Sequence, residues 1–294
     1  TRCRGNMTMP GNDPAVPVAE TTSTPSARNL WLRVVSAAVL APLAIVAAYF
    51  GDWPFTIFWA LAAVAVWWEW VGLVQPAGRY VVLATGAAVL ALEALLFEIG
   101  TLSVVVMMIA LGMLATIVTA GRHALLVAGG MIYASALVIA PAVLRADMKL
   151  GFAAIVFLFA VVWGTDIAGY FAGRAFGGPR LAPSISPKKT WSGAIGGSIV
   201  AIVAALAIAH VFSIRNPAAT GLIALVLSIA SQAGDLFESK LKREFHAKDA
   251  SGLIPGHGGV MDRLDGFIFA SVVAALIGVV RGGLELPATG LLVW

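Results

Sequence analysis

Hydrophobic residues occur along this chain in runs of about 20, separated by short polar segments. Such runs match the thickness of a bilayer and are too long for the strands of a soluble domain. Because unpaired backbone polar groups are costly in lipid, each run is predicted to be a helix. The runs lie at about 32–50, 53–74, 80–97, 101–120, 124–144, 151–173, 193–213, 218–237 and 264–280.

The composition agrees with a lipid environment. Of the 294 residues, 60% are hydrophobic and 12% are charged, whereas soluble domains have about 45–50% and about 25%. The single cysteine, Cys3, can form neither an internal disulfide nor a cysteine metal site. The predicted fold class is therefore all-α, a polytopic integral membrane protein with about nine transmembrane helices.

The pattern divides the chain into three regions. Residues 1–30 are rich in Pro, Thr, Asn and Ser and are predicted to be a disordered tail. Residues 31–150 hold about five spans, and residues 151–294 hold about four, with polar loops at 174–192 and 238–263. The first apolar run is too long for a signal peptide, so we expect a retained helix.

Lys and Arg residues are distributed unequally between the two sides that nine spans would define. The tail and the two polar loops share one side, and fifteen of the 19 Lys and Arg residues fall there. Cytoplasmic segments of membrane proteins carry this excess. We therefore expect a cytoplasmic N-terminus. The net charge of +4 is small, and the charged residues are distributed by membrane side. This charge therefore indicates no nucleic-acid partner.

Carboxylates within apolar runs are costly and are therefore functional candidates. Asp166 and Asp235 lie toward the predicted cytoplasmic ends of their runs, and Asp262 and Asp265 lie at the start of the last run. Four aspartates are thus expected at one face of the membrane, beside the basic loops.

Three glutamates receive a different interpretation. Glu69, Glu93 and Glu98 also lie in or near apolar runs, but no other polar group accompanies them in the sequence. Side chains of this kind often extend to the membrane interface. We expect these three glutamates to do so.

The segment 234–266 combines carboxylates, cations and glycines. A helix is predicted to continue past Asp235 to Lys242, and the run of glycines around Pro255 that follows cannot be helical. Such a loop offers backbone N–H groups to an anion. Mg²⁺ takes one or two carboxylates together with phosphate oxygens, and Lys and Arg neutralise phosphoryl charge. The segment therefore favours chemistry on a polyphosphate.

The earlier polar loop offers a similar set. Ser186, Lys188, Lys189 and Thr190 precede a predicted helix N-terminus, where phosphate groups bind readily. The positive-inside rule alone would also place two lysines there. Phosphate binding and a topology signal therefore both remain open for this loop.

A long motif resembles the signature of the phosphatidate cytidylyltransferases, also called CDP-diacylglycerol synthases. From Ser239 to Asp265 it reads Ser-x-Leu-Lys-Arg-x4-Lys-Asp-x-Ser-x2-Ile-Pro-x-His-Gly-Gly-Val-x-Asp-Arg-Leu-Asp. The runs at 186–191 and 164–166 also look like that family's. The resemblance covers the C-terminal half, and the first five spans match only in being hydrophobic.

The resemblance implies transfer of CMP from CTP to phosphatidate, giving CDP-diacylglycerol and pyrophosphate, at the cytoplasmic face of the cell (inner) membrane. Family members are described as binding two metals through aspartates that match Asp235 and Asp262, so Mg²⁺ and a second cation are expected there. Further catalytic candidates are Lys242, Arg243, Lys248, Asp249, His257, Arg263 and Asp265. Substrate-binding candidates are Asp166, Ser186, Lys188, Lys189, Thr190, Ser239, Gly258 and Gly259.

The residues suit this reaction independently. The attacking phosphate oxygen is already ionised near neutral pH, since the second pKa of a phosphate monoester is about 6. No strong general base is needed, and catalysis rests on charge neutralisation and positioning.

Two other interpretations compete with this one. A related CTP-dependent enzyme acting on another lipid, such as a CDP-archaeol synthase or a polyprenol kinase, is the main alternative; the kinase would release CDP. A transporter is disfavoured because its carboxylates would spread through the membrane depth and its sequence would repeat. A homodimer is left open.

Overall fold

The computed structural model describes residues 27–74, 78–100, 102–253 and 258–294. Helices dominate these residues, and the all-α prediction is confirmed. The helices are α1 (Ala27–Phe50), α2 (Asp52–Val74), α3 (Arg79–Ile99), α4 (Leu102–Ala120), α5 (Ala124–Arg145), α6 (Gly151–Phe176), α7 (Trp191–Val211), α8 (Pro217–Glu244), α9 (Met261–Gly282) and α10 (Pro287–Leu292), with a 3-10 turn η1 (Gly121–His123).

Eight of the predicted spans coincide with helices long and apolar enough to cross a membrane, α2 to α9. The first predicted span, 32–50, coincides with α1, whose described apolar stretch Ala38–Phe50 is shorter. The predicted tail lies outside the described residues except for 27–30, which belong to α1. The chain is a multi-pass membrane protein, and the side of its N-terminus stays a prediction.

A short β-hairpin lies in the polar loop predicted at 174–192. β1 (Arg180–Ala182) pairs antiparallel with β2 (Ser186–Thr190). The pairing gives this non-helical segment partners for its backbone polar groups. Thr190 Oγ1 then accepts a hydrogen bond from Gly193 N at 3.2 Å, so the hairpin ends in the N-cap of α7.

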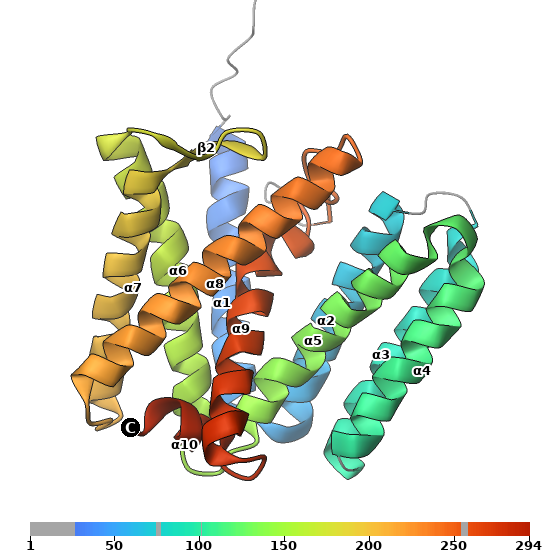
Figure 1. Cartoon of the computed structure of the whole chain (residues 1–294), viewed down its shortest axis with the longest axis horizontal. Helices are drawn as coiled ribbons and strands as arrows, with labels where there is room; N and C mark the ends of the chain where they lie inside the picture. Colours follow the sequence, from blue (N-terminus) through green and yellow to red (C-terminus); the bar gives the residue numbers. More distant parts are fainter. Residues whose placement is uncertain (1–26, 75–77, 101, 254–257) are drawn as a thin grey trace, which may run out of the picture.

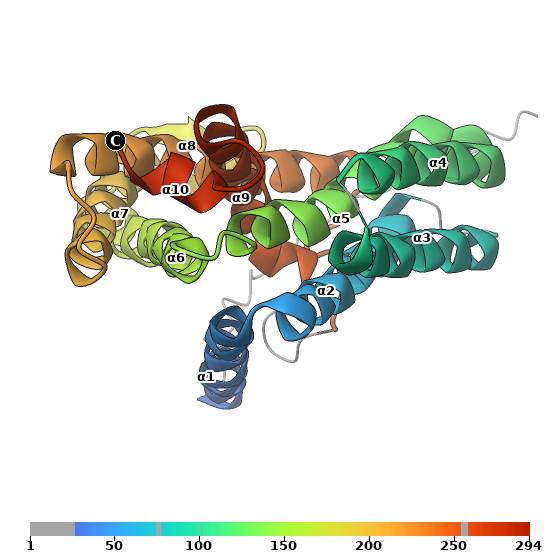
Figure 2. The ribbon, with the colours of Figure 1, turned by 90° about the horizontal axis from the view of Figure 1, so that it is seen from below.

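The helices are arranged so that three separate segments meet at one end of the bundle. Figure 1 shows α8 running obliquely past α6, α7 and α9, with α2–α5 on the other side. Seen from below, α1 stands at the edge next to α2 (Figure 2). The C-terminal end of α8, the N-terminal end of α9 and the β-hairpin therefore lie at the same end (Figure 1).

Small residues let α6 and α7 approach closely. A Cβ at Gly193 would lie 2.8 Å from the carbonyl oxygen of Gly169, and a Cβ at Gly197 would lie 2.6 Å from that of Thr165. Such interfaces are typical of helices packed within membranes. The close packing brings Asp166 of α6 to the same cavity as the end of β2.

Aromatic packing joins the N-terminal and C-terminal helices. Trp59 of α2 stacks on Phe267 of α9 with ring centroids 4.6 Å apart, and Phe159 of α6 lies 5.4 Å from Phe267. All three side chains are buried. The position of α9 therefore depends on α2, which lies about 200 residues earlier in the chain.

Polar contacts close the opposite end of the bundle, where α9 ends. The Asp147 carboxylate accepts hydrogen bonds from Lys149 N at 2.8 Å and from Thr289 N of α10 at 2.7 Å. Arg145 donates through Nη2 to the carbonyl of Tyr49 at 3.1 Å. These contacts fasten the loop between α5 and α6 to α1 and α10.

Candidate active site

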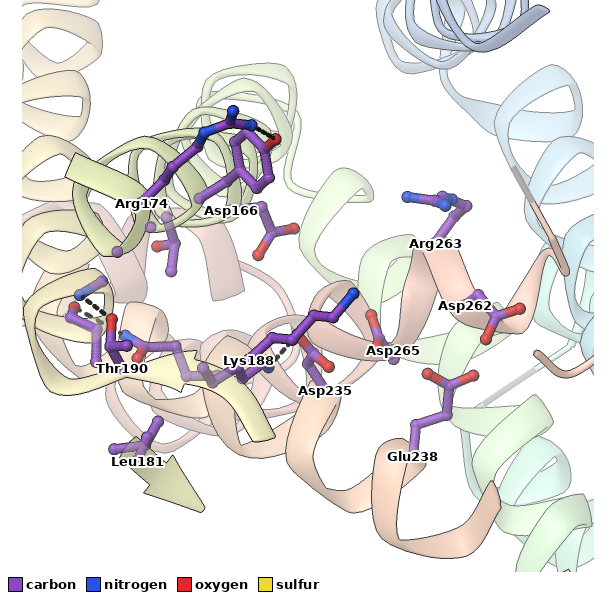
Figure 3. Close-up of a pocket in the computed structure, with 18 of the residues that line it drawn as sticks. Asp166, Arg174, Leu181, Lys188, Thr190, Asp235, Glu238, Asp262, Arg263 and Asp265 are labelled. Carbon is purple, nitrogen blue, oxygen red and sulfur yellow. Dashed lines mark hydrogen bonds and ion pairs between the residues drawn. The ribbon is translucent and has the colours of Figure 1, made fainter. Parts of the chain in front are cut away.

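A cavity of about 650 Å³ lies between α6, α7, α8, α9 and β2. It is at the end of the bundle where α8 ends and α9 begins. Carboxylates and cations both line it (Figure 3). Its charged lining consists of Asp166, Arg174, Lys188, Lys189, Asp235, Glu238, Lys242, Asp249, Asp262, Arg263 and Asp265.

Asp235 lies on α8, which continues past Asp235 to Lys242 as predicted and ends at Glu244. Its carboxylate forms an ion pair with Lys189 of β2, and Ser239 Oγ donates to Asp235 Oδ1 at 3.4 Å. The two polar loops predicted from the sequence therefore meet at this aspartate.

Asp262, in the first turn of α9, is held by a second lysine. Lys242 Nζ lies 2.5 Å from Asp262 Oδ1 and 3.1 Å from Glu238 Oε2. The other oxygen of Asp262 accepts from Ala250 N at 3.0 Å and from Gly259 N at 2.7 Å. A carboxylate with these partners has a fixed orientation.

Gly258 next to Asp262 fits the sequence expectation that glycines allow close approach. It has φ +85°, and a Cβ there would lie 2.9 Å from Asp262 Oδ2. A side chain would be strained at this position. The glycine thus shapes the backbone around the carboxylate.

Most of the site residues predicted from the sequence come together. Those that line the cavity are Asp166, Lys188, Lys189, Thr190, Asp235, Lys242, Asp249, Asp262, Arg263 and Asp265. Among the described residues, the predicted ones outside its lining are Ser186, Ser239, Arg243, Lys248, Gly258 and Gly259. His257 lies outside the described residues. The roles assigned to all these residues stay predictions.

Glu238 is a cavity residue that was not among the predicted site residues. It lies one turn after Asp235 on the same face of α8, and this spacing could have identified it as a site residue from the sequence. The residue is 1% exposed, and its Oε1 has no hydrogen-bond partner among the described residues. A buried carboxylate oxygen without a partner is unusual and fits a site for a cation.

A polar cluster that the sequence did not indicate adjoins the cavity, and its residues Thr165 and Gln232 line the cavity. Thr165 Oγ1 donates to Ser228 Oγ at 2.8 Å, and Ser198 Oγ lies 3.0 Å from Ser228 Oγ. Gln232 Nε2 donates to Ser198 Oγ at 3.2 Å. Helices α6, α7 and α8 each contribute to the cluster, and its hydrogen bonds stabilise their contact within the membrane.

The acidic residues of the cavity fit Mg²⁺ when it is bound together with phosphate. Within the described ranges, no three acidic, His or Cys side chains are placed to hold a metal ion by themselves. Mg²⁺ ordinarily binds proteins through one or two carboxylates and takes its other ligands from water and phosphates. Asp235 and Asp262 line one cavity, and they provide carboxylates of the required kind.

The fold and the cavity define a multi-pass membrane protein with a charged site at the end of its helices. Residues 31–280 match the profile of the cytidylyltransferase family. The chain belongs to this family, as the motif at 239–265 predicted.

Several relatives carry the name phosphatidate cytidylyltransferase. The relative from Brucella suis is 40% identical over 265 residues, which cover 88% of this chain and 97% of the relative. The relative from Haemophilus influenzae is 48% identical over 118 residues, 38% of this chain and 40% of its own. The relative from Bacillus subtilis is 44% identical over 110 residues, 37% of this chain and 41% of its own.

Proposed function

We propose that this protein transfers CMP from CTP to phosphatidate and leaves CDP-diacylglycerol in the membrane. The observation that carries the proposal is the cavity in which Lys189 pairs with Asp235 and Lys242 pairs with Asp262. Membership of the cytidylyltransferase family and the name of its relatives support the same activity.

The reaction exchanges one phosphoanhydride bond for another. A phosphate oxygen of phosphatidate forms a bond to the α-phosphorus of CTP, and the bond from that phosphorus to the β-phosphate breaks. Pyrophosphate leaves with the electron pair. Both reactants are anions, so the main obstacle is charge repulsion, which cationic groups relieve.

The two ion pairs provide a way to receive such reactants. Lys189 and Lys242 neutralise Asp235 and Asp262 in the structure. When CTP and Mg²⁺ enter, the two aspartates would hold the cation and the two ammonium groups would turn to phosphate oxygens. Bound Mg²⁺ would supply charge neutralisation at the reacting phosphates. A second cation is part of the proposal, with Glu238 as a further carboxylate.

Other cations of the cavity would bind the remaining phosphate charge. Lys188 and Arg174 line the cavity from β2 and α6, and Arg263 lines it from α9 (Figure 3). Lys and Arg in these positions can orient the triphosphate and the leaving pyrophosphate. No side chain has to remove a proton, because the phosphatidate phosphate is ionised at neutral pH.

The place of the cavity suits one lipid and one water-soluble reactant. It lies at the helix ends, where a lipid headgroup and a nucleotide can both reach it. The excess of Lys and Arg on the same side supports a cytoplasmic location for this end, in the cell (inner) membrane.

The test uses two labels in CTP. Purified protein in detergent is incubated with phosphatidate, Mg²⁺ and CTP that carries radiolabel in the α- or the γ-phosphate. We expect α-label in the lipid, γ-label in released pyrophosphate, and no labelled lipid when phosphatidate is omitted. Transfer of γ-label to a polyprenol would instead identify a kinase, and absence of any labelled lipid would refute the proposal.

A further inference from the structure

Helix α9 begins with a cap that comes from a distant helix. Its own N-cap residue, Val260, has no side chain able to accept a hydrogen bond. Instead Glu69 of α2 accepts from Val260 N at 2.8 Å through Oε1 and from Met261 N at 2.6 Å through Oε2. Ser251 Oγ adds a third bond, 2.5 Å from Glu69 Oε1. Glu69 is 1% exposed.

Glu69 provides acceptors for backbone N–H groups that have no partner within α9. The first N–H groups of an α-helix have no partner inside the helix and carry a partial positive charge. A carboxylate meets both needs because its two oxygens accept hydrogen bonds and its charge is opposite. Without Glu69, the amides of Val260 and Met261 would be left without these hydrogen bonds in a largely buried place.

The cap is adjacent to Asp262. Met261, which Glu69 holds, precedes Asp262 directly, and Gly259 N donates to Asp262 Oδ2. A Cβ at Gly259 would lie 2.8 Å from both carboxylate oxygens of Glu69. The two carboxylates therefore share one short backbone segment, with Asp262 holding Gly259 N and Glu69 holding the next two amides.

We propose that Glu69 is a positioning residue for the reaction. It fixes the first turn of α9 so that the Asp262 carboxylate faces the cavity, and it makes the N-terminal helices part of the site. The inference rests on the proposed function. This role could not be predicted from the sequence, because Glu69 lies outside the recognised motif and 191 residues before Val260.

A matched control is present in the same half of the chain. Glu93 of α3 is 0% exposed and accepts a hydrogen bond from Ser135 Oγ at 3.0 Å. It does not line the cavity. Glu69→Gln and Glu93→Gln make the same chemical change to a buried carboxylate. A difference in activity between the two variants therefore reflects the different hydrogen-bond partners of the two glutamates.

The experiment compares Glu69→Gln with Glu93→Gln in the full chain, in detergent. We expect Glu69→Gln to lower kcat by about 10- to 100-fold and to raise the Mg²⁺ concentration for half-maximal rate, as loss of a group that orients a metal ligand does. Glu93→Gln should keep kcat per folded molecule within about twofold. Ser251→Ala, which removes one of three bonds to Glu69, should have an intermediate effect.

A second measurement separates this inference from the proposed function. Hydrogen exchange of the peptide spanning 258–263, without CTP or Mg²⁺, should quicken in Glu69→Gln and not in Glu93→Gln. If both variants lose kcat equally, or if the exchange is unchanged in Glu69→Gln, the inference is wrong. The wild-type protein could label no lipid while hydrogen exchange is still faster in Glu69→Gln than in Glu93→Gln. In that case the proposed function is wrong, but the capping of α9 by Glu69 is confirmed.

Discussion

Carboxylates in the two halves of the molecule have different partners. In the C-terminal helices, Asp235 and Asp262 each pair with a lysine, although Asp262 also accepts hydrogen bonds from two backbone amides. In the N-terminal helices, Glu93 is held by a hydroxyl, and Glu69 by a hydroxyl and two backbone amides. A lysine can exchange its carboxylate for a phosphate, whereas a backbone amide stays where the fold puts it. The first half thus provides fixed support, and the second provides groups that can change partners.

The largest effect should come from removing the negative charge of the paired aspartates. We expect Asp235→Asn and Asp262→Asn each to lower the rate of CDP-lipid formation by about 10³-fold or more, because an amide is a poor Mg²⁺ ligand. The measurement is the initial rate with α-labelled CTP, with thermal unfolding in detergent as the check on folding. Turnover like that of the wild type in either variant would remove that residue from the proposed site.

The next effect tests the lysine that joins two acidic residues. Lys242→Met removes the cation that pairs with both Glu238 and Asp262, so we expect a loss of about 100-fold in kcat. Lys240→Met is the matched control, because Lys240 is exposed and does not line the cavity. Its kcat should stay within about twofold. Equal losses in the two variants would mean that the pairing is not important for turnover.

The sequence predicted the spans and the charged cluster for clear physical reasons. Apolar runs of membrane length must be helical, and Lys242 and Asp262 belong to a long recognisable motif, with Asp235 just before its start. The hairpin at 180–190 was not predicted, because a segment rich in Pro, Ser and Lys looks like a loop.

The expectation that Glu69 and Glu93 extend to the interface was wrong, since both are buried. Their partners, Ser251 and Ser135, lie 182 and 42 residues away. Hydropathy does not show which helices touch, because in a membrane the lipid-facing and the packed positions are both apolar. The hydrogen-bond partners of these glutamates therefore could not be predicted from neighbouring residues in the chain.

A smaller effect should follow from disturbing the fixed half alone. Ser135→Ala removes the hydrogen-bond donor to Glu93 Oε1, while Oε2 already lacks a partner within the part of the chain that the structure describes. We expect a loss of about 1–3 kcal/mol in stability, seen as a lower Tm in detergent. The kcat per folded molecule should not change. A fall in kcat at unchanged folded fraction would show that the N-terminal helices affect the reaction through more than Glu69.

The smallest effect concerns Asp147, at the far end of α9 from the cavity. Burial raises the pKa of Asp147, but hydrogen bonds from Thr289, Lys149 and Leu150 outweigh it and hold the pKa below its ordinary value. The ionised carboxylate therefore stabilises the fold above the unfolded pKa of about 3.9, and this contribution is lost as pH falls through that value toward the folded pKa.

Asp147→Asn removes this titration. We expect the Tm of the wild type to exceed that of the variant at about pH 6 and the gap to narrow as pH falls to about 3. Turnover at neutral pH should be equal in the two proteins, because Asp147 acts on α10 and the start of α6. Its described hydrogen-bond donors, Lys149, Leu150 and Thr289, do not line the cavity. A gap that stays constant with pH would contradict the role of the ionised carboxylate. A loss of turnover would instead show that the closed end of the bundle affects the site, since α9 is the helix that connects them.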